Sequence, residues 1–148
     1  MNRTGGRISA LLSITFLLLA AESAQAQNVT LSVSGIRSPK GTICVSVFRN
    51  EAGFKENKPV SRLKFAKTDL VQGKLTLSLQ LAQGIYGIAL LDDENGNGKM
   101  DNNMVGMPKE GFGFSNFYLS GLSRPSFNDF RFDVTAAAVN LTSKLRYL

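Results

Sequence analysis

The sequence contains no histidine, and this absence limits the chemistry available to the chain. Neither a Ser-His-Asp nor a Cys-His catalytic arrangement can form, and a zinc site built on imidazole is excluded as well. The single cysteine, Cys44, has no partner for an internal disulfide bond, so a packed core must supply the stability. With no histidine or second cysteine to activate it, Cys44 is expected to be a small, half-buried residue. We therefore expect the protein not to be an enzyme.

Long apolar runs are scarce, and the only extended one lies at the N-terminus. Residues 1–26 have the composition of a secretory signal peptide: Arg3 and Arg7 precede a short apolar run at 8–21, and Ala24-Gln25-Ala26 is a cleavage sequence. The run is too short to cross a bilayer, and no later segment is long enough. We expect export to the periplasm or the extracellular space, and a mature chain 27–148 without a transmembrane segment.

The mature chain has a length that suits a single domain. Positive charges outnumber negative ones over the whole chain, with a formal net charge of +6. A basic surface can favour anionic glycans, lipid headgroups or an acidic cell-surface or periplasmic protein. The charge is not dense enough to indicate nucleic-acid binding, and ordinary solubility is the interpretation we prefer.

Apolar and polar residues alternate along most of the mature chain, which is the pattern of half-buried strands. The alternating segments are 28–34, 42–48, 74–81, 126–134 and 139–147, whereas 85–91 is apolar on both faces and is expected to be a central strand. Residues 50–67 are irregular and basic, and we interpret them as a connection with one helical turn capped by Asn50.

About seven short strands with almost no helical period predict an all-β protein, an antiparallel β-sandwich of the immunoglobulin or transthyretin-like (prealbumin-like) kind. The sequence has no tryptophan and lacks the Cys…Trp…Cys pattern, so a true immunoglobulin domain is excluded.

The acidic segment 93–101 follows the spacing of a calcium-binding loop. The candidate ligands are Asp93, Asn95, Asn97, Lys99 (through its carbonyl) and Asp101. Gly98 stands where such a loop makes its sharp turn. The same Asn-Gly composition also forms turns without any metal, because Asn and Gly tolerate positive φ. Calcium binding and plain turn chemistry are therefore both open.

The loop departs from the calcium pattern at its twelfth position, where Met104 replaces the usual bidentate Glu. Asp92, Glu94 or Glu110 would have to fold in to complete the coordination. We expect any calcium affinity to be weak, roughly in the 10⁻⁴–10⁻³ M range of extracellular modules.

An aromatic segment follows the loop. The candidate ligand-binding residues there are Phe112, Phe114, Phe117 and Tyr118. Exposed rings would stack on a glycan or bind a small ligand, whereas buried rings would plug the open end of the sandwich, which we prefer. A hydrolase that uses two clustered carboxylates is a third and less favoured interpretation. The preferred overall interpretation is a non-catalytic exported binding or structural module with a weak calcium loop.

The segments Asp92-Asp-Glu-Asn-Gly-Asn-Gly-Lys99 and Gly106-Met-Pro-Lys-Glu-Gly-Phe-Gly-Phe-Ser-Asn116 resemble the secreted bacterial proteins grouped as domain of unknown function 2141. The resemblance extends over the whole mature chain and implies a small exported β-sandwich. It assigns no catalytic or binding residues, because no activity is established for that family. The family loop often has a His before the Asp, at the position of Asp92, so a role that needs this His is missing or altered here.

Overall fold

The computed structural model describes residues 25–148. The predicted signal peptide, residues 1–26, lies outside the described residues except for its last two. The elements, in chain order, are β1 (Gln27–Ser34), β2 (Thr42–Phe48), α1 (Glu51–Lys55), β3 (Ser61–Ala66), β4 (Leu75–Leu81), β5 (Gly84–Asp93), β6 (Gly111–Phe114), α2 (Phe127–Phe130), β7 (Arg131–Val134) and β8 (Val139–Lys144). In this part of the chain, no helix is long and apolar enough to span a membrane.

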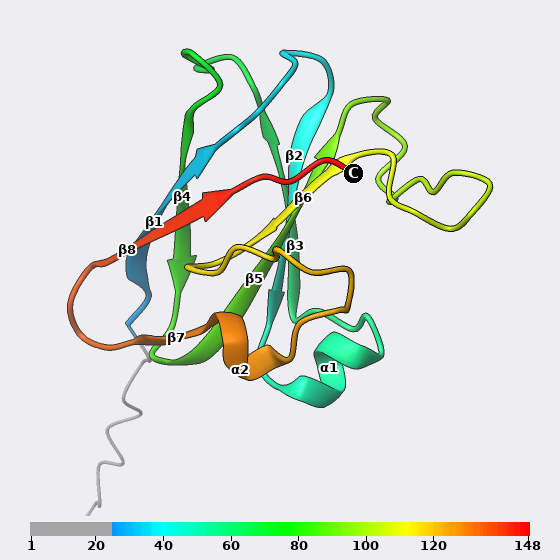
Figure 1. The fold of residues 1–148 in the computed structure, drawn as a ribbon. Coiled ribbons are helices and arrows are strands. Elements are labelled where there is room, and N and C mark those ends of the chain that lie inside the picture. The colour runs from blue at the N-terminus through cyan, green and yellow to red at the C-terminus, as the bar shows by residue number, and fades with distance from the viewer. Residues whose placement is uncertain (1–24) are drawn as a thin grey trace, which may run out of the picture.

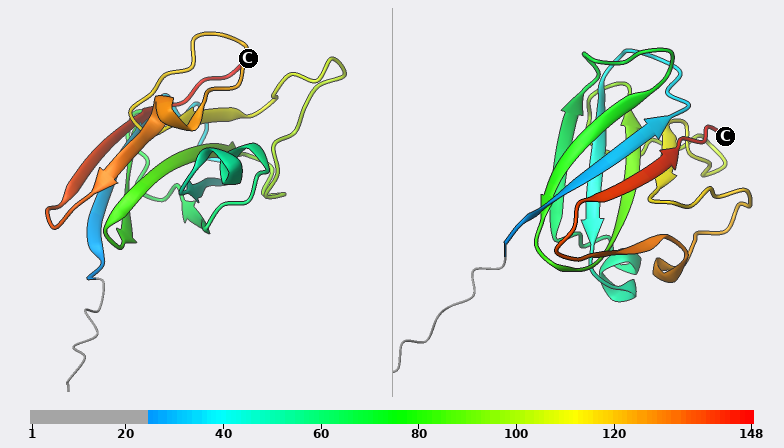
Figure 2. Two further views of the ribbon diagram at one scale, coloured as in Figure 1. Left: turned by 90° about the horizontal axis from the view of Figure 1, so that it is seen from below. Right: turned by 90° about the vertical axis from the view of Figure 1, so that its left-hand side faces the viewer.

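The strands form two stacked sheets, which confirms the predicted β-sandwich (Figures 1 and 2). The first sheet has the order β4-β1-β8, and the second has the order β3-β2-β5-β6, with β7 also paired to β5. All pairs are antiparallel except β1 with β8, which run parallel. The long strand β5 is the centre of the second sheet, since β2 lies along one side and β6 and β7 lie end to end along the other.

The core between the sheets is built by the alternation seen in the sequence. Strand β4 is the simplest case, because every second side chain from Leu75 to Leu81 is buried and the residues between them are exposed. Strand β2 contributes Ile43, Val45 and Val47, each with no exposed surface. These side chains pack against those of β1 and β5 in one apolar cluster.

A second apolar cluster covers the outer face of the second sheet. Its buried members are Phe48, Phe54, Phe114, Phe127 and Phe130. The two short helices lie at the end of β5 opposite the acidic loop (Figure 1), and they supply three of these rings. Gly87 of β5 makes this packing possible, because a Cβ there would lie 2.5 Å from the Phe130 ring. At the end of the sheet near the two helices, the outer face is therefore apolar and covered rather than solvated.

Two segments differ from the sequence-based expectation. Residues 61–66 form the edge strand β3 and not a connection; most of its side chains are exposed, so the apolar alternation is hidden. Residues 127–130 form α2 where a strand was expected, because the Asp129 carboxylate accepts a hydrogen bond from Ser126 N (2.8 Å) and starts a helical turn. The count of strands is consequently eight and not about seven.

Candidate functional site

Strand β5 ends in two adjacent aspartates that point to opposite faces of the sheet. Asp92 and Asp93 are both fully buried, with 0% exposed surface. Asp92 follows Ile88 and Leu90 on the inner face, whereas Asp93 follows Ala89 and Leu91 on the outer face. A buried carboxylate requires hydrogen bonds or an opposite charge nearby. Because the two side chains lie on opposite faces, each needs its own set of partners.

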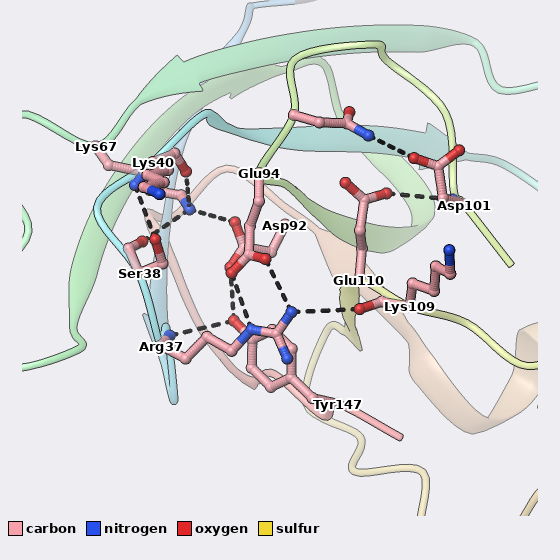
Figure 3. Close-up of polar contacts among 11 residues, drawn as sticks. Arg37, Ser38, Lys40, Lys67, Asp92, Glu94, Asp101, Lys109, Glu110 and Tyr147 are labelled. Atoms are coloured by element: carbon pink, nitrogen blue, oxygen red, sulfur yellow. Dashed lines mark hydrogen bonds and ion pairs between the residues drawn. The ribbon is translucent and has the colours of Figure 1, made fainter. Parts of the chain in front are cut away.

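Asp92 is compensated by groups of the protein itself (Figure 3). Its Oδ1 forms an ion pair with Lys67 Nζ, and both side chains are almost completely buried. Its Oδ2 accepts a hydrogen bond of 2.6 Å from the Tyr147 hydroxyl. The Lys67 ammonium also donates to the carbonyls of Ser38 (3.0 Å) and Lys40 (2.6 Å), so its charge is fully used. This arrangement is a structural ion pair and leaves no position for a ligand.

Tyr147 reaches Asp92 because the inner face of β6 carries glycine. A Cβ on Gly111 would lie 2.4 Å from the Tyr147 ring, so only glycine allows the ring to pack there. Burial and the hydrogen bond to Asp92 raise the pKa of Tyr147 well above its ordinary value. The Gly-Phe-Gly-Phe motif is thus explained: its glycines accommodate the C-terminal segment, and its phenylalanines face the second cluster.

Glu94 is also paired with a group of the protein itself. Its carboxylate accepts hydrogen bonds of 2.9 and 2.8 Å from the Arg37 guanidinium, which lies 4.3 Å above the centre of the Tyr147 ring. The hydrogen bond from Arg37 lowers the pKa of Glu94. Arg37 donates in addition to the Lys109 carbonyl (3.3 Å) and so closes the inner end of the sandwich.

Asp93 is only half satisfied. Its Oδ2 accepts hydrogen bonds from Gly98 N (2.8 Å) and from the Cys44 thiol (3.7 Å), whereas its buried Oδ1 has no partner. Burial raises the pKa of the Cys44 thiol, so this group stays protonated and neutral beside the carboxylate. No lysine or arginine forms a salt bridge with Asp93 within residues 25–148.

The predicted calcium loop turns around Asp93 and projects from the sandwich (Figures 1 and 2). Gly96 and Gly98 have φ of 76° and 74°, the left-handed region that favours glycine. The side-chain oxygens of Asn95 and Asn97 accept from the backbone two residues later, at 3.0 and 2.8 Å. Their amide nitrogens both donate to Asp101 Oδ2. The loop therefore brings the five predicted ligand residues into one compact turn, in which the Lys99 backbone N–H donates to Asn97.

Glu110 completes the group from the neighbouring strand. Asp92 pairs with Gly111, so continuing the register by one residue places Glu110 opposite Asp93. Glu110 is 4% exposed; its Oε2 accepts from Asp101 N (3.2 Å), and its buried Oε1 has no partner (Figure 3). Of the three residues expected to fold in at the missing twelfth position, Asp92 and Glu94 are used elsewhere, and Glu110 alone retains a free oxygen.

A cleft of about 600 Å³ opens beside these carboxylates. Its lining residues are Arg37, Glu94, Asn95, Asp101, Asn102, Lys109 and Glu110. Acidic side chains by themselves do not form a closed cage: no group of three or more His, Cys, Asp or Glu suited to a metal exists in the described chain. A cation here would need the Asn95 and Asn97 amides as well as the carboxylates.

The aromatic segment is divided between core and surface. Phe114 is buried in the second cluster, and Phe112 and Phe117 pack against it while remaining partly exposed. Tyr118 is 48% exposed and lies under the Lys144 ammonium, 5.5 Å from it. The four candidates thus do not form one continuous aromatic platform.

Sequence reasoning missed the partners of Asp92, namely Lys67 and Tyr147, and the pairing of Glu94 with Arg37. The sequence did indicate that Asp92 needs a partner. Residues 88, 90 and 92 lie on the same face of the strand, so Asp92 is buried beside Ile88 and Leu90 and requires a group that compensates its charge. Nothing in the sequence identified which cation would reach it, since Lys67 and Tyr147 are distant in the chain.

The fold and site define a small β-sandwich with an acidic loop at one end. The chain belongs to the family described as "Uncharacterized protein conserved in bacteria (DUF2141)", whose model matches residues 31–142. The match covers the loop, Glu110 and all strands except parts of β1 and β8. No curated protein and no solved structure matches the chain.

Proposed function

We propose that this protein is an exported, non-catalytic module that binds calcium through the loop 93–101 and Glu110. The observation that carries the proposal is the pair of buried carboxylates, Asp93 and Glu110, each with one oxygen that no protein group satisfies. An unpaired buried carboxylate is costly, and a bound cation would remove that cost.

The donor chemistry fits a hard cation. Calcium takes six to eight oxygen ligands from carboxylates, amides, carbonyls and water at 2.3–2.6 Å. Asp93, Asp101 and Glu110 supply carboxylates, and Asn95 and Asn97 supply amide oxygens that retain a second lone pair. Glu110, entering from the next strand, takes the place of the Glu that a self-contained loop has at its twelfth position.

The adjacent Asp92 supports this assignment by contrast. Its charge is already balanced by Lys67, whereas Asp93 on the other face forms no salt bridge with a described residue. Lys64 Nζ lies close to Gly98 of the loop but does not pair with Asp93. We also propose that the module is not an enzyme, because its acidic groups are engaged by backbone and amide donors as in a binding loop.

Unfolding in calcium and in chelator tests the proposal. At about a hundredfold excess over Kd, calcium should raise the free energy of unfolding by about 2.7 kcal/mol, which is a Tm shift on the order of 10 °C. Asp93→Asn and Glu110→Gln should each abolish most of that shift. Asp133→Asn, a matched change at an exposed carboxylate of β7, should leave the shift intact.

Magnesium at equal concentration should give a much smaller shift, because it keeps its own water shell and requires near-octahedral geometry. Two results would contradict the proposal. The first is an unchanged Tm at a calcium concentration of about 10 mM, ten times the weakest expected Kd. The second is an equal Tm shift in wild type and Asp93→Asn. Either would reduce the loop to turn chemistry.

A further inference from the structure

The outer face of the second sheet carries a groove that the acidic site does not use. It has a volume of about 1240 Å³, somewhat above the range of about 300–1,000 Å³ typical of small-molecule sites. The floor is the outer face of β2, β3 and β5, and the walls are residues 98–108 and 119–125. The groove begins at Phe54 of α1 and ends beside Pro108 in the loop.

The floor of the groove is apolar and rigid. Ala89, Leu91 and Phe112 form its partly exposed surface. Ala89 and Phe112 pack against the buried second cluster, where the Phe54 and Phe114 rings meet edge to face at 6.2 Å and 87°. The buried rings keep the surface above them preformed, so a ligand would bind without having to order it.

Two large apolar side chains at the groove stay exposed to solvent. Leu122 and Leu148 have exposed fractions of 74% and 46%. Isolated exposed leucines are common, but two beside one groove extend its apolar surface toward solvent. This distribution fits a ligand that enters from solvent and covers them.

The charged side chains that line the groove are all cationic. They are Arg62, Lys64, Lys99 and Arg124, and no Asp or Glu side chain lines it. None of these four cations forms a salt bridge within the described chain. Arg62 and Lys64 are two residues apart on β3 and therefore face the same side of the sheet. An apolar floor beside an uncompensated pair of cations is complementary to an amphiphile with an anionic head.

We propose that this groove binds a free long-chain carboxylate. The hydrocarbon chain lies on the partly exposed floor of Ala89, Leu91 and Phe112 and covers Leu122. The carboxylate lies between Arg62 and Lys64. The proposal does not rest on calcium binding, since none of the proposed calcium ligands is needed to hold the chain or the head.

A fluorescence titration with cis-parinaric acid, a fluorescent long-chain carboxylate, tests the proposal on purified protein in the presence of chelator. We expect saturable one-to-one binding that oleate displaces. Oleyl alcohol, which has the same chain and no charge, should displace the probe at least tenfold less well. Chelator separates this result from the calcium proposal, which can fail or succeed independently.

Matched variants locate the binding. Arg62→Glu should weaken probe binding about tenfold, and Leu122→Ser should weaken it several-fold; both positions are exposed, so the fold is preserved. The controls are Lys74→Glu and Val71→Ser, which make the same changes at exposed positions outside the groove and should leave the affinity unchanged.

Three results would overturn the proposal. Oleate and oleyl alcohol could displace the probe equally, which would remove any role for the carboxylate. Arg62→Glu could bind as well as Lys74→Glu, which would place the head group elsewhere. Finally, the protein could bind phosphatidylglycerol vesicles while free oleate fails to displace the probe, and the face would then be a membrane-contact surface.

Discussion

Asp92 and Asp93 are neighbours in the chain, equally buried, and in opposite electrostatic situations. Asp92 meets a lysine, a tyrosine and, through them, two backbone carbonyls. Asp93 meets one backbone amide and a neutral thiol, and one of its oxygens meets nothing. The comparison teaches that burial of an acid does not by itself indicate a function. The informative feature is whether the fold pairs the acid with an opposite charge, and within residues 25–148 no salt bridge forms with Asp93.

The largest effect is expected where the fold does supply that charge. Lys67→Met should lower the free energy of unfolding by about 3–5 kcal/mol, because Asp92 is left buried without a cation. Denaturant unfolding measures the loss. Lys67→Met combined with Asp92→Asn should recover most of it, since no charge is then buried; a double variant as unstable as the single one would contradict the ion-pair interpretation.

The next effect concerns Tyr147, the second partner of Asp92. Tyr147→Phe should cost about 1.5–3 kcal/mol, the range for a hydrogen bond to a charged group. The pKa of Tyr147 is raised in the folded state, so its contribution is fully present below the ordinary tyrosine value near 10 and is lost as the pH rises beyond it. Unfolding between pH 8 and 11 should show a steeper alkaline loss in wild type than in Tyr147→Phe.

Replacing Asp93 should raise the stability, whereas replacing a partner of Asp92 lowers it. In chelator, Asp93→Asn removes an unpaired buried charge and keeps the shape, so the free energy of unfolding should rise on the order of 1 kcal/mol. Asp92→Asn under the same conditions should lower it, because Lys67 loses its partner. If both changes destabilise the protein equally, the contrast between the two faces is wrong.

The smallest effect is expected at the exposed rim. Glu94→Gln breaks the pair with Arg37 and should change the stability by less than about 1 kcal/mol, since solvent screens the pair. The pKa of Glu94 is lowered, so its small contribution is present above the ordinary value and disappears as the pH falls. Comparing the acid unfolding of Glu94→Gln and wild type checks this, and a loss as large as that of Lys67→Met would show that the rim is part of the buried network.

Strands with a clear apolar alternation were correctly predicted from the sequence, and the mostly exposed strand β3 was not. β4 buries every second residue, and the sequence shows this as leucines that alternate with polar residues. β3 exposes most of its side chains, so its basic residues resembled a solvated connection. The α2 turn was missed because Phe127 and Phe130 also fit an extended pattern, and the hydrogen bond of Asp129 decided between the two.

The sequence by itself determined the loop: spacing placed Asp93, Asn95, Asn97 and Asp101 together because all lie within nine residues, and local turns depend on local residues. It also determined that one face of each strand is buried. Only the tertiary structure decided that Glu110 joins the loop while Asp92 and Glu94 do not, and that cations gather beside an apolar groove. Those outcomes depend on strand register and on contacts between distant segments, such as Lys67 and Tyr147 meeting at Asp92, and the linear order of residues does not contain them.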